Sequence, residues 1–284
     1  MNRSAVIIPA RDEVRSIAGV IDDVLNTIRP DLVVVVDDRS CDSTADEARR
    51  AGALVVSTDS DHTGLGSAMN LGVRTGRRAG CDTFLTIDAD GQYRAADLLR
   101  LWNFQRVGGF DMVVGDRLAD GRPESMRRVR YSANQVFSTV FSAALDLEQR
   151  TDSQSGMRVF NSAVADTCAV TNSFTYTQEQ LLRARIQGLR TATTPVSFER
   201  RVHGRSRLVR STLDYAYRTV PHLIRVYLEH AGGNAHQARG RLLDQLATLD
   251  APSLTSTAAA ASLADHSGWA SPGKAAGLPD FSRQ

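Results

Sequence analysis

Residues 83–92 read Thr-Phe-Leu-Thr-Ile-Asp-Ala-Asp-Gly-Gln, an apolar run that ends in two aspartates. The run from Thr83 to Ile87 is typical of a buried strand, since it is short, apolar and followed by turn-forming residues. Asp88 and Asp90 would then lie at the carboxyl end of that strand, where open α/β sheets bind ligands. An Asp-x-Asp arises by chance roughly once in a chain of average composition. Its position favours a ligand site, and a solvated turn is the alternative.

The flanking sequence repeats this alternation of short apolar runs and amphipathic segments. Such a pattern predicts an α/β fold with a mixed, mainly parallel, Rossmann-like sheet flanked by helices. We expect strands at 5–9, 32–37, 54–57, 83–87, 112–115 and 190–196. We expect helices at 14–27, 44–51, 65–79, 95–107, 126–145 and 176–187. The helix at 44–51 opens with Thr44-Ala-Asp-Glu47, which predicts a capping box.

The end of the chain differs from this pattern. Residues 211–250 predict a C-terminal helical appendage, with one helix at 212–230 and a shorter one at 239–249, after a main domain at 1–210. The tail at 251–284 is rich in Ala, Ser, Gly and Pro, which predicts disorder. The helix at 212–230 would either lie on a membrane or pack on the domain. Its expected apolar face comprises Leu213, Ala216, Val220, Leu223, Ile224 and Tyr227.

Composition limits the class of protein. The chain has 284 residues and a net charge of only +2, which argues against a nucleic-acid-binding protein. Three widely spaced cysteines, at 41, 81 and 168, predict a reducing, cytoplasmic location without disulfides. No stretch has the apolar length of a membrane span, so we expect at most peripheral contact with a membrane. Zinc, acyl-transfer and dinucleotide motifs are missing, and so is the glycine-rich loop expected of a sugar nucleotidyltransferase.

Charged residues gather where strands are expected to end. Two carboxylates at such an edge suit Mg²⁺ or Mn²⁺, which binds through one or two carboxylates and substrate phosphates. A metal ion there would neutralise a diphosphate leaving group. Asp37 and Asp38, which follow another strand, would either bind a ribose or base or cap a turn. Arginines on separate elements would supply cations for phosphate groups, and they are Arg117, Arg128, Arg201 and Arg207.

Six motifs in this order resemble those of the family 2 glycosyltransferases, over about residues 4–210. They are Ile-Pro-Ala-Arg-Asp-Glu at 8–13, Val-Asp-Asp-Arg-Ser-Cys-Asp-Ser-Thr at 36–44, Thr-Ile-Asp-Ala-Asp-Gly-Gln at 86–92, Val-Val-Gly-Asp-Arg at 113–117, Asp-Ser-Gln-Ser-Gly-Met-Arg at 152–158 and Arg-Val-His-Gly-Arg-Ser-Arg at 201–207. The branch most similar to the chain is that of the polyprenyl-phosphate sugar synthases, which includes dolichyl-phosphate mannosyltransferase.

This resemblance implies a GT-A fold and an inverting transfer of a hexose from a UDP- or GDP-linked donor. It implies that Asp88, Asp90 and Gln92 hold Mg²⁺ or Mn²⁺ beside the diphosphate. It places Arg128 and Ser132 at the acceptor phosphate. The implied catalytic residues are Asp90, Asp152 and Arg117. The implied donor-binding residues are Pro9, Arg11, Glu13, Asp37, Asp38, Asp88, Gln92, Arg201 and Arg207, the last on a mobile loop.

Three residues depart from the family pattern: Asp12 replaces asparagine, Arg39 replaces glycine and Met157 replaces an aromatic residue. A glycine would permit a positive φ, so Arg39 puts the turn geometry in question.

Three functions remain open. A polyprenyl phosphate acceptor is already ionised and needs no general base. A soluble hydroxyl acceptor needs one, for which Asp152 or Glu179 would serve. The third is a non-catalytic protein that binds nucleic acid through the basic run at 200–210.

Overall fold

The computed structural model describes residues 3–145, 147, 149–167, 169–172, 175–201 and a helix at 212–230, whose side chains are described from 219 to 228. The helix expected at 239–249, the tail at 251–284, Arg207 and Cys168 lie outside these residues.

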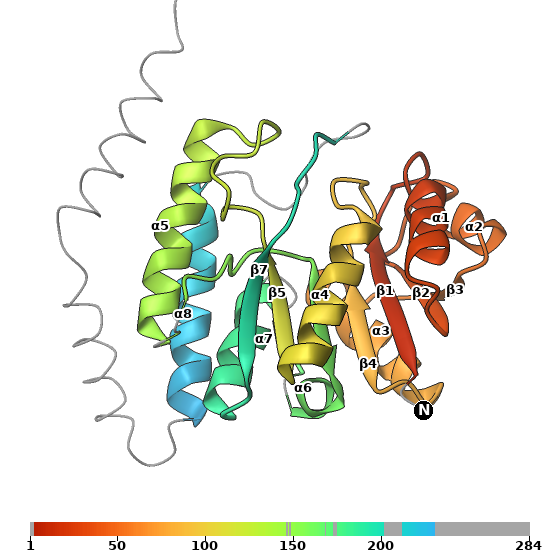
Figure 1. Cartoon of the computed structure of the whole chain (residues 1–284). Coiled ribbons are helices and arrows are strands. Elements are labelled where there is room, and N and C mark those ends of the chain that lie inside the picture. The colour runs from red at the N-terminus through yellow and green to blue at the C-terminus, as the bar shows by residue number, and fades with distance from the viewer. Residues whose placement is uncertain are drawn as a thin grey trace, which may run out of the picture.

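A seven-stranded sheet forms the centre of the molecule, with strand order β3-β2-β1-β4-β6-β5-β7 (Figure 1). The strands are β1 (Ser4–Ala10), β2 (Leu32–Asp37), β3 (Leu54–Ser57), β4 (Thr83–Thr86), β5 (Met112–Asp116), β6 (Arg158–Asn161) and β7 (Thr191–Pro195). Every pairing is parallel except those that β6 makes with β4 and β5. The predicted α/β class with a mixed, mainly parallel sheet is confirmed.

Helices cover both faces of the sheet. They are α1 (Ile17–Thr27), α2 (Thr44–Arg50), α3 (Leu65–Arg78), α4 (Ala95–Gly108), α5 (Arg128–Ala144), α6 (Ser162–Thr167), α7 (Tyr176–Ile186) and α8 (Thr212–His230). Val6 and Ile8 of β1 point toward the core that α1, α2 and α4 cover, whereas Ala5 and Ile7 point toward α3, α6 and α7. This alternation has a period of two, as a strand buried on both faces requires.

The strand β6 and the helix α6 were missing from the sequence prediction. Arg158, the first residue of β6, is fully buried. A charged residue lowers the apolar signal of a short strand, so the pattern at 158–161 does not predict a strand.

The predicted capping box was wrong. Thr44 is the first helical residue of α2, and Ser43 before it makes no side-chain cap. The Thr44 hydroxyl accepts a hydrogen bond from the backbone N–H of Glu13 at 2.8 Å and donates one to Asp42. A contact with a segment 31 residues away replaces the local cap, which sequence spacing alone does not predict.

Helix α8 packs against α7. Leu223 and Val226 are buried, and Nε2 of His222 lies 3.0 Å from Oε2 of the fully buried Glu179. Burial opposes ionisation of Glu179, but hydrogen bonds from His222, Thr171 and Arg183 outweigh it and lower the pKa of this carboxyl. Part of the predicted apolar face is therefore packing, while Val220 and Ile224 stay exposed. Over the part of the chain that the structure describes, every helix is too short or too polar to span a bilayer.

Candidate functional site

Acidic and basic side chains from three distant segments meet at the carboxyl edge of the sheet, at the top of Figure 1. Glu13 follows β1, Asp90 follows β4, and Arg201 follows β7. A guanidinium nitrogen of Arg201 forms an ion pair with Glu13, and its Nε lies 3.7 Å from Oδ2 of Asp90. The three residues are at most partly exposed, so their charges interact strongly. The edge selected from the sequence therefore carries a partly buried cluster of charged side chains, at the crevice expected beyond the carboxyl ends of the strands.

Burial opposes ionisation of the carboxyl groups in this crevice. Burial and the charge of Asp90 raise the pKa of Asp88 to about 7, against the opposing charges of Arg117 and Arg201. Burial also raises the pKa of Asp90, and burial with the charge of Asp90 raises that of Glu13. A divalent cation between Asp88 and Asp90 would stabilise both in their ionised form.

Two carboxylates fit the way Mg²⁺ and Mn²⁺ bind beside substrate phosphates. In the described part of the chain, no group of three or more His, Cys, Asp or Glu side chains is arranged to enclose a metal ion. Gln92, the third expected ligand, donates its side-chain N–H to the carbonyl of Glu199 at 2.8 Å and its backbone N–H to Asp90 at 3.1 Å. It thus joins the Asp88–Asp90 turn to the segment after β7, and its role as a ligand stays a prediction.

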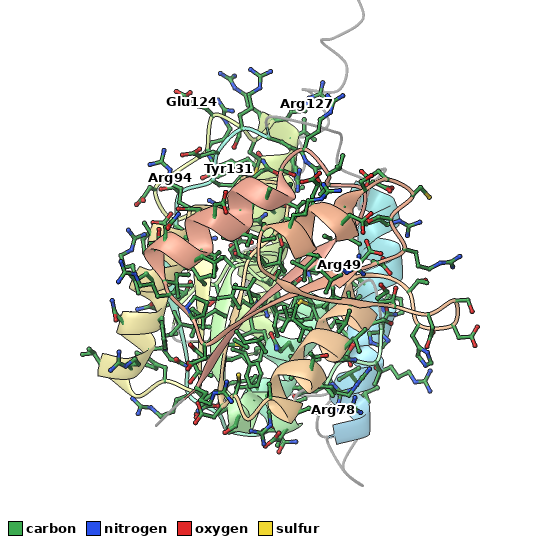
Figure 2. All side chains as sticks on the ribbon, turned by 90° about the vertical axis from the view of Figure 1, so that its right-hand side faces the viewer. Arg49, Arg78, Arg94, Glu124, Arg127 and Tyr131 are labelled. Carbon is green, nitrogen blue, oxygen red and sulfur yellow. The ribbon has the colours of Figure 1, made fainter. Side chains whose placement is uncertain are left out.

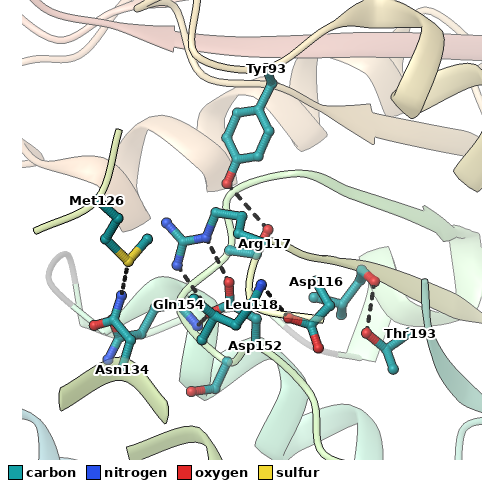
Figure 3. Close-up of polar contacts among 12 residues, drawn as sticks. Tyr93, Asp116, Arg117, Leu118, Met126, Asn134, Asp152, Gln154 and Thr193 are labelled. Carbon is teal, nitrogen blue, oxygen red and sulfur yellow. Dashed lines mark hydrogen bonds and ion pairs between the residues drawn. The ribbon is translucent and has the colours of Figure 1, made fainter. Parts of the chain in front are cut away.

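Arg117 and Asp152 form a buried ion pair behind the crevice (Figure 3). Nε of Arg117 donates to Oδ2 of Asp152 at 2.6 Å and Nη2 donates to Oδ1 at 3.0 Å. Arg117 also lies over the ring of Phe198 at 5.1 Å. Asp152 is fully buried, and its Oδ1 accepts a further bond from the backbone N–H of Gln154. The two expected catalytic residues are thus each other's partners, and their catalytic roles stay predictions.

The loop at 152–156 is shaped by Arg158, which the sequence analysis did not select as a site residue. Its Nε donates to the carbonyl of Ser155 at 3.0 Å and its Nη2 to that of Ser153 at 3.3 Å. Nη1 of Arg158 donates a third hydrogen bond, to Oε1 of Gln180 in α7 at 3.3 Å. The available signal was an arginine within the otherwise apolar stretch 157–160. This guanidinium holds the loop in place from below the crevice.

Gly156 brings this loop against Asp88. A Cβ atom at position 156 would lie 3.0 Å from Cγ and Oδ2 of Asp88 and closer still to Oδ1. The carbonyl of Gly156 accepts a 2.6 Å bond from the Thr86 hydroxyl, so the loop is unable to move away freely. Only glycine allows so close an approach.

Gly156→Ala is therefore expected to displace the Asp88 carboxyl and to lower the sugar-transfer activity that the motifs imply by about tenfold or more, since small displacements at a reacting centre are costly. The measurement is the rate of sugar transfer together with affinity for Mn²⁺. Gly19→Ala is the matched control, because a Cβ on Gly19 in α1 meets no atom within 4 Å. Equal activity of the two variants would show that Asp88 does not depend on Gly156.

The predicted nucleotide-binding residues lie at the ends of β1 and β2. Pro9 pairs with Val36 in the sheet, and Asp38 accepts bonds from the Thr58 hydroxyl at 2.8 Å and the Gly64 N–H at 3.0 Å. Arg11 lies 3.7 Å from the same carboxylate. Asp37 is buried beside it, and its Oδ1 accepts a 3.4 Å bond from the Ser40 N–H. The geometry is compatible with both predicted roles of Asp37 and Asp38, which are binding of a ribose or base and capping of a turn.

The turn that carries Arg39 keeps a left-handed backbone without glycine. Arg39 has φ +59° and Asp12 in the facing loop has φ +53°. Oδ1 of Asp12 accepts a 2.6 Å bond from the Cys41 N–H, and its own N–H donates to Ser40. Aspartate tolerates this region better than most residues. Arg39, which replaces the family's glycine, itself adopts the left-handed conformation, so the turn geometry is preserved.

Near the residues expected to bind the acceptor phosphate, the structure adds an arginine to those expected. Arg128 is the first residue of α5 and is exposed, and Ser132 lies one turn later. Two residues after Arg128, the side chain of Arg130 is exposed, but desolvation of its guanidinium and repulsion from Arg117 lower its pKa, and its charge acts on Asp90. Arg130 thus belongs to the electrostatic environment of the crevice. Helical spacing predicts that Arg128 and Ser132 are neighbours on the surface of α5. It does not show which side of α5 faces the crevice, so it does not select Arg130.

Known proteins resemble the chain in sequence and fold. Glycosyltransferase AglJ of Haloferax volcanii is 30% identical over 70% of this chain and 64% of its own length, so the match leaves over a third of that relative uncovered. Undecaprenyl-phosphate mannosyltransferase of Micrococcus luteus is 27% identical over 72% of this chain and 87% of its own. Glucosyl-3-phosphoglycerate synthase of Mycobacterium tuberculosis, solved with Mn²⁺, UDP and phosphoglyceric acid, superposes with a TM-score of 0.59 at 18% identity, covering 81% of this chain and 79% of that chain.

The fold likeness agrees with the GT-A architecture that the six motifs imply. The family model for glycosyl transferase family 2 matches residues 5–168, which include all the motifs except the basic run after β7. The same span contains Asp88, Asp90 and the loop that holds Gly156. The chain therefore belongs to glycosyl transferase family 2.

Proposed function

We propose that this enzyme moves a hexose, with inversion, from a UDP- or GDP-linked donor to a polyprenyl phosphate, using Mg²⁺ or Mn²⁺. Two observations support binding of a nucleoside-diphosphate sugar and a metal ion. The first is the pair of carboxyl groups of Asp88 and Asp90, whose pKa values are raised, and the second is Arg201 beside them. The similarity to undecaprenyl-phosphate mannosyltransferase supports a polyprenyl phosphate as the acceptor.

One observation favours a phosphate acceptor over a hydroxyl acceptor. The two candidate bases for a hydroxyl acceptor, Asp152 and Glu179, already form hydrogen bonds with basic side chains of the protein. Asp152 is fully buried and both its oxygens accept bonds from Arg117. Glu179 is fully buried under α8, where His222 and Arg183 hold it as a carboxylate. An acceptor that is ionised before it binds requires no such base.

The groups that remain in the crevice suit a reaction between phosphates. A divalent cation between Asp88 and Asp90 would neutralise the diphosphate as it leaves. Glu13 holds the guanidinium of Arg201, and the buried Nε of Arg201 has no hydrogen-bond partner among the described residues. That N–H is suited to bind a phosphate oxygen, because a buried donor without a partner is costly.

In the proposed reaction, an oxygen of the acceptor phosphate attacks the anomeric carbon as the bond from that carbon to the diphosphate oxygen breaks. The acceptor brings its own negative charge, so no proton is taken up by the protein. Arg201 and Arg130 place positive charge beside the reacting phosphates. Such fixed cations stabilise developing charge without reorganisation.

A paired-acceptor assay tests this proposal. UDP- and GDP-hexoses are supplied with Mn²⁺ and either a short-chain prenyl phosphate or the matching prenol. We expect product from the phosphate alone, since the prenol requires a base that Asp152 and Glu179 do not provide. Product from hydroxyl acceptors alone would overturn the choice of acceptor.

A further inference from the structure

A cavity lies between the loop at 122–127 that precedes α5 and the segment at 198–200 after β7, next in sequence to Arg201. Its volume is about 890 Å³. Side chains of both segments line it, and they are Arg122, Glu124, Ser125, Met126, Arg127, Phe198, Glu199 and Arg200. None of these residues belongs to the donor or metal site described above.

The cavity has excess positive charge. Arg122, Arg127 and Arg200 are exposed, and no carboxylate of the described residues forms an ion pair with them. Of the two acidic residues in the lining, Glu199 is already paired with Arg94. Glu124 alone is left to balance three guanidinium groups. Guanidinium forks match phosphate oxygens well, so the cavity suits a phosphate-bearing ligand.

The walls of the cavity are fixed in place. Nη1 of Arg122 donates to the carbonyl of Met126 at 2.6 Å, and the Ser125 hydroxyl donates to the carbonyl of Phe198 at 2.8 Å. The second bond joins the two segments across 73 residues of sequence. The cavity is thus formed before a ligand arrives.

Phe198 separates this cavity from the reacting groups. Its ring packs against Tyr93 at 5.2 Å and under Arg117 at 5.1 Å. A phosphate bound among the three arginines would therefore lie beside the crevice and would not be the reacting phosphate. Figure 2 shows Glu124 and Arg127 projecting from one end of the molecule, with Arg49 and Arg78 on other parts of the surface.

We propose that this cavity binds the phosphate headgroup of an anionic phospholipid and so holds the crevice against a membrane surface. The proposal rests on the proposed lipid acceptor, which must be reached from a bilayer. Charge complementarity selects the partner: the guanidinium groups match an anionic surface, and the partly exposed ring of Phe198 lines the same cavity.

Co-sedimentation of the full chain with vesicles tests the proposal. We expect salt-sensitive binding to phosphatidylcholine vesicles that contain phosphatidylglycerol, and little binding to phosphatidylcholine alone. Replacing Arg122, Arg127 and Arg200 together by glutamine should weaken binding by roughly a hundredfold, given the contribution of each basic residue near an anionic surface. The double variant Arg127→Gln/Arg200→Gln keeps the bonds of Arg122 and should lose a large part of the same affinity.

The matched control replaces Arg49, Arg74 and Arg78 by glutamine, which changes the net charge equally on exposed positions elsewhere. Equal loss of binding in both triple variants, equal binding to neutral vesicles, or binding of soluble glycerol phosphate without binding of vesicles would overturn the proposal. Transfer to a short-chain prenyl phosphate in detergent is measured in parallel and should be unchanged in the cavity variants. If the parent lacks that transfer but binds vesicles through the cavity, the proposed acceptor fails while the lipid site stands.

Discussion

Asp90→Ala is expected to lower hexosyl transfer by about a thousandfold, because it removes half of the carboxylate pair that would hold the metal ion and leaves the departing diphosphate poorly neutralised. Asp90 lies at the end of β4, where it contacts Arg201 across 3.7 Å and accepts a bond from the Gln92 N–H. Affinity for Mn²⁺ should fall with the activity, since Asp88 alone is a weak site. Both quantities can be measured by calorimetry with UDP- and GDP-sugars and by single-turnover transfer.

The Asp90→Ala variant should lose activity without losing stability. Burial raises the pKa of Asp90, so its charge is unfavourable in the folded protein without a metal ion. Loss of the charge should leave the free energy of unfolding unchanged or slightly higher. Asp22→Ala, on an exposed position of α1, is the control and should retain full activity. A variant at Asp90 that binds and turns over the donor like the parent would show that the metal assignment is wrong.

The second large effect concerns the buried pair of Arg117 and Asp152. Asp152→Asn and Arg117→Met should each lower the free energy of unfolding by about 3–5 kcal/mol, because each leaves a buried charge without its partner. The double variant has no such charge, so we expect it to lose no more stability than either single variant. Denaturant unfolding of the four proteins measures this coupling.

The same set of variants tests whether Asp152 takes part in catalysis. A catalytic base would give an Asp152→Asn protein that is nearly as stable as the parent but inactive. A pair that positions the 152–156 loop against Asp88 would lower stability and activity together, and the double variant would recover part of both. The exposed pair of Asp46 and Arg49 is the control, and its variants should leave stability almost unchanged. Additive losses in the cycle would contradict a coupled role for Arg117 and Asp152.

Much of the sheet could be predicted from the sequence because its signal is local. The apolar runs that became β1, β2, β4 and β5 alternate with amphipathic helices, and this periodicity follows from burial of one sheet between two layers. The carboxyl edge of the sheet was predictable for the same reason, since strand direction follows from the alternation. Asp88 and Asp90 follow the strand predicted at 83–87, so periodicity assigns them to this edge, whereas Glu13 is assigned to the nucleotide only by the family resemblance.

The order of motifs along the chain also determined the family, as the match over residues 5–168 confirms. The hydrogen-bond and ion-pair partners of the charged residues could not be predicted from the sequence, because the segments that supply them meet only when the chain folds. Asp152 is one of two candidate bases for a hydroxyl acceptor in the sequence analysis, and the structure pairs its oxygens with Arg117, 35 residues away. Thr44 was expected to cap its own helix, yet its hydroxyl binds the backbone of Glu13.

What the sequence by itself determined is the fold class, the family and the edge of the sheet that carries the chemistry, because these follow from periodicity and from the spacing of motifs. Only the tertiary structure decided which charges are free and which are paired. It put Arg158 under the loop at 152–156, brought Arg130 near Asp90 and left the three arginines of the outer cavity without carboxylate partners among the described residues. The reason is physical: the energy of a charge depends on its distance to other charges and on its burial, and both quantities exist only in the folded chain.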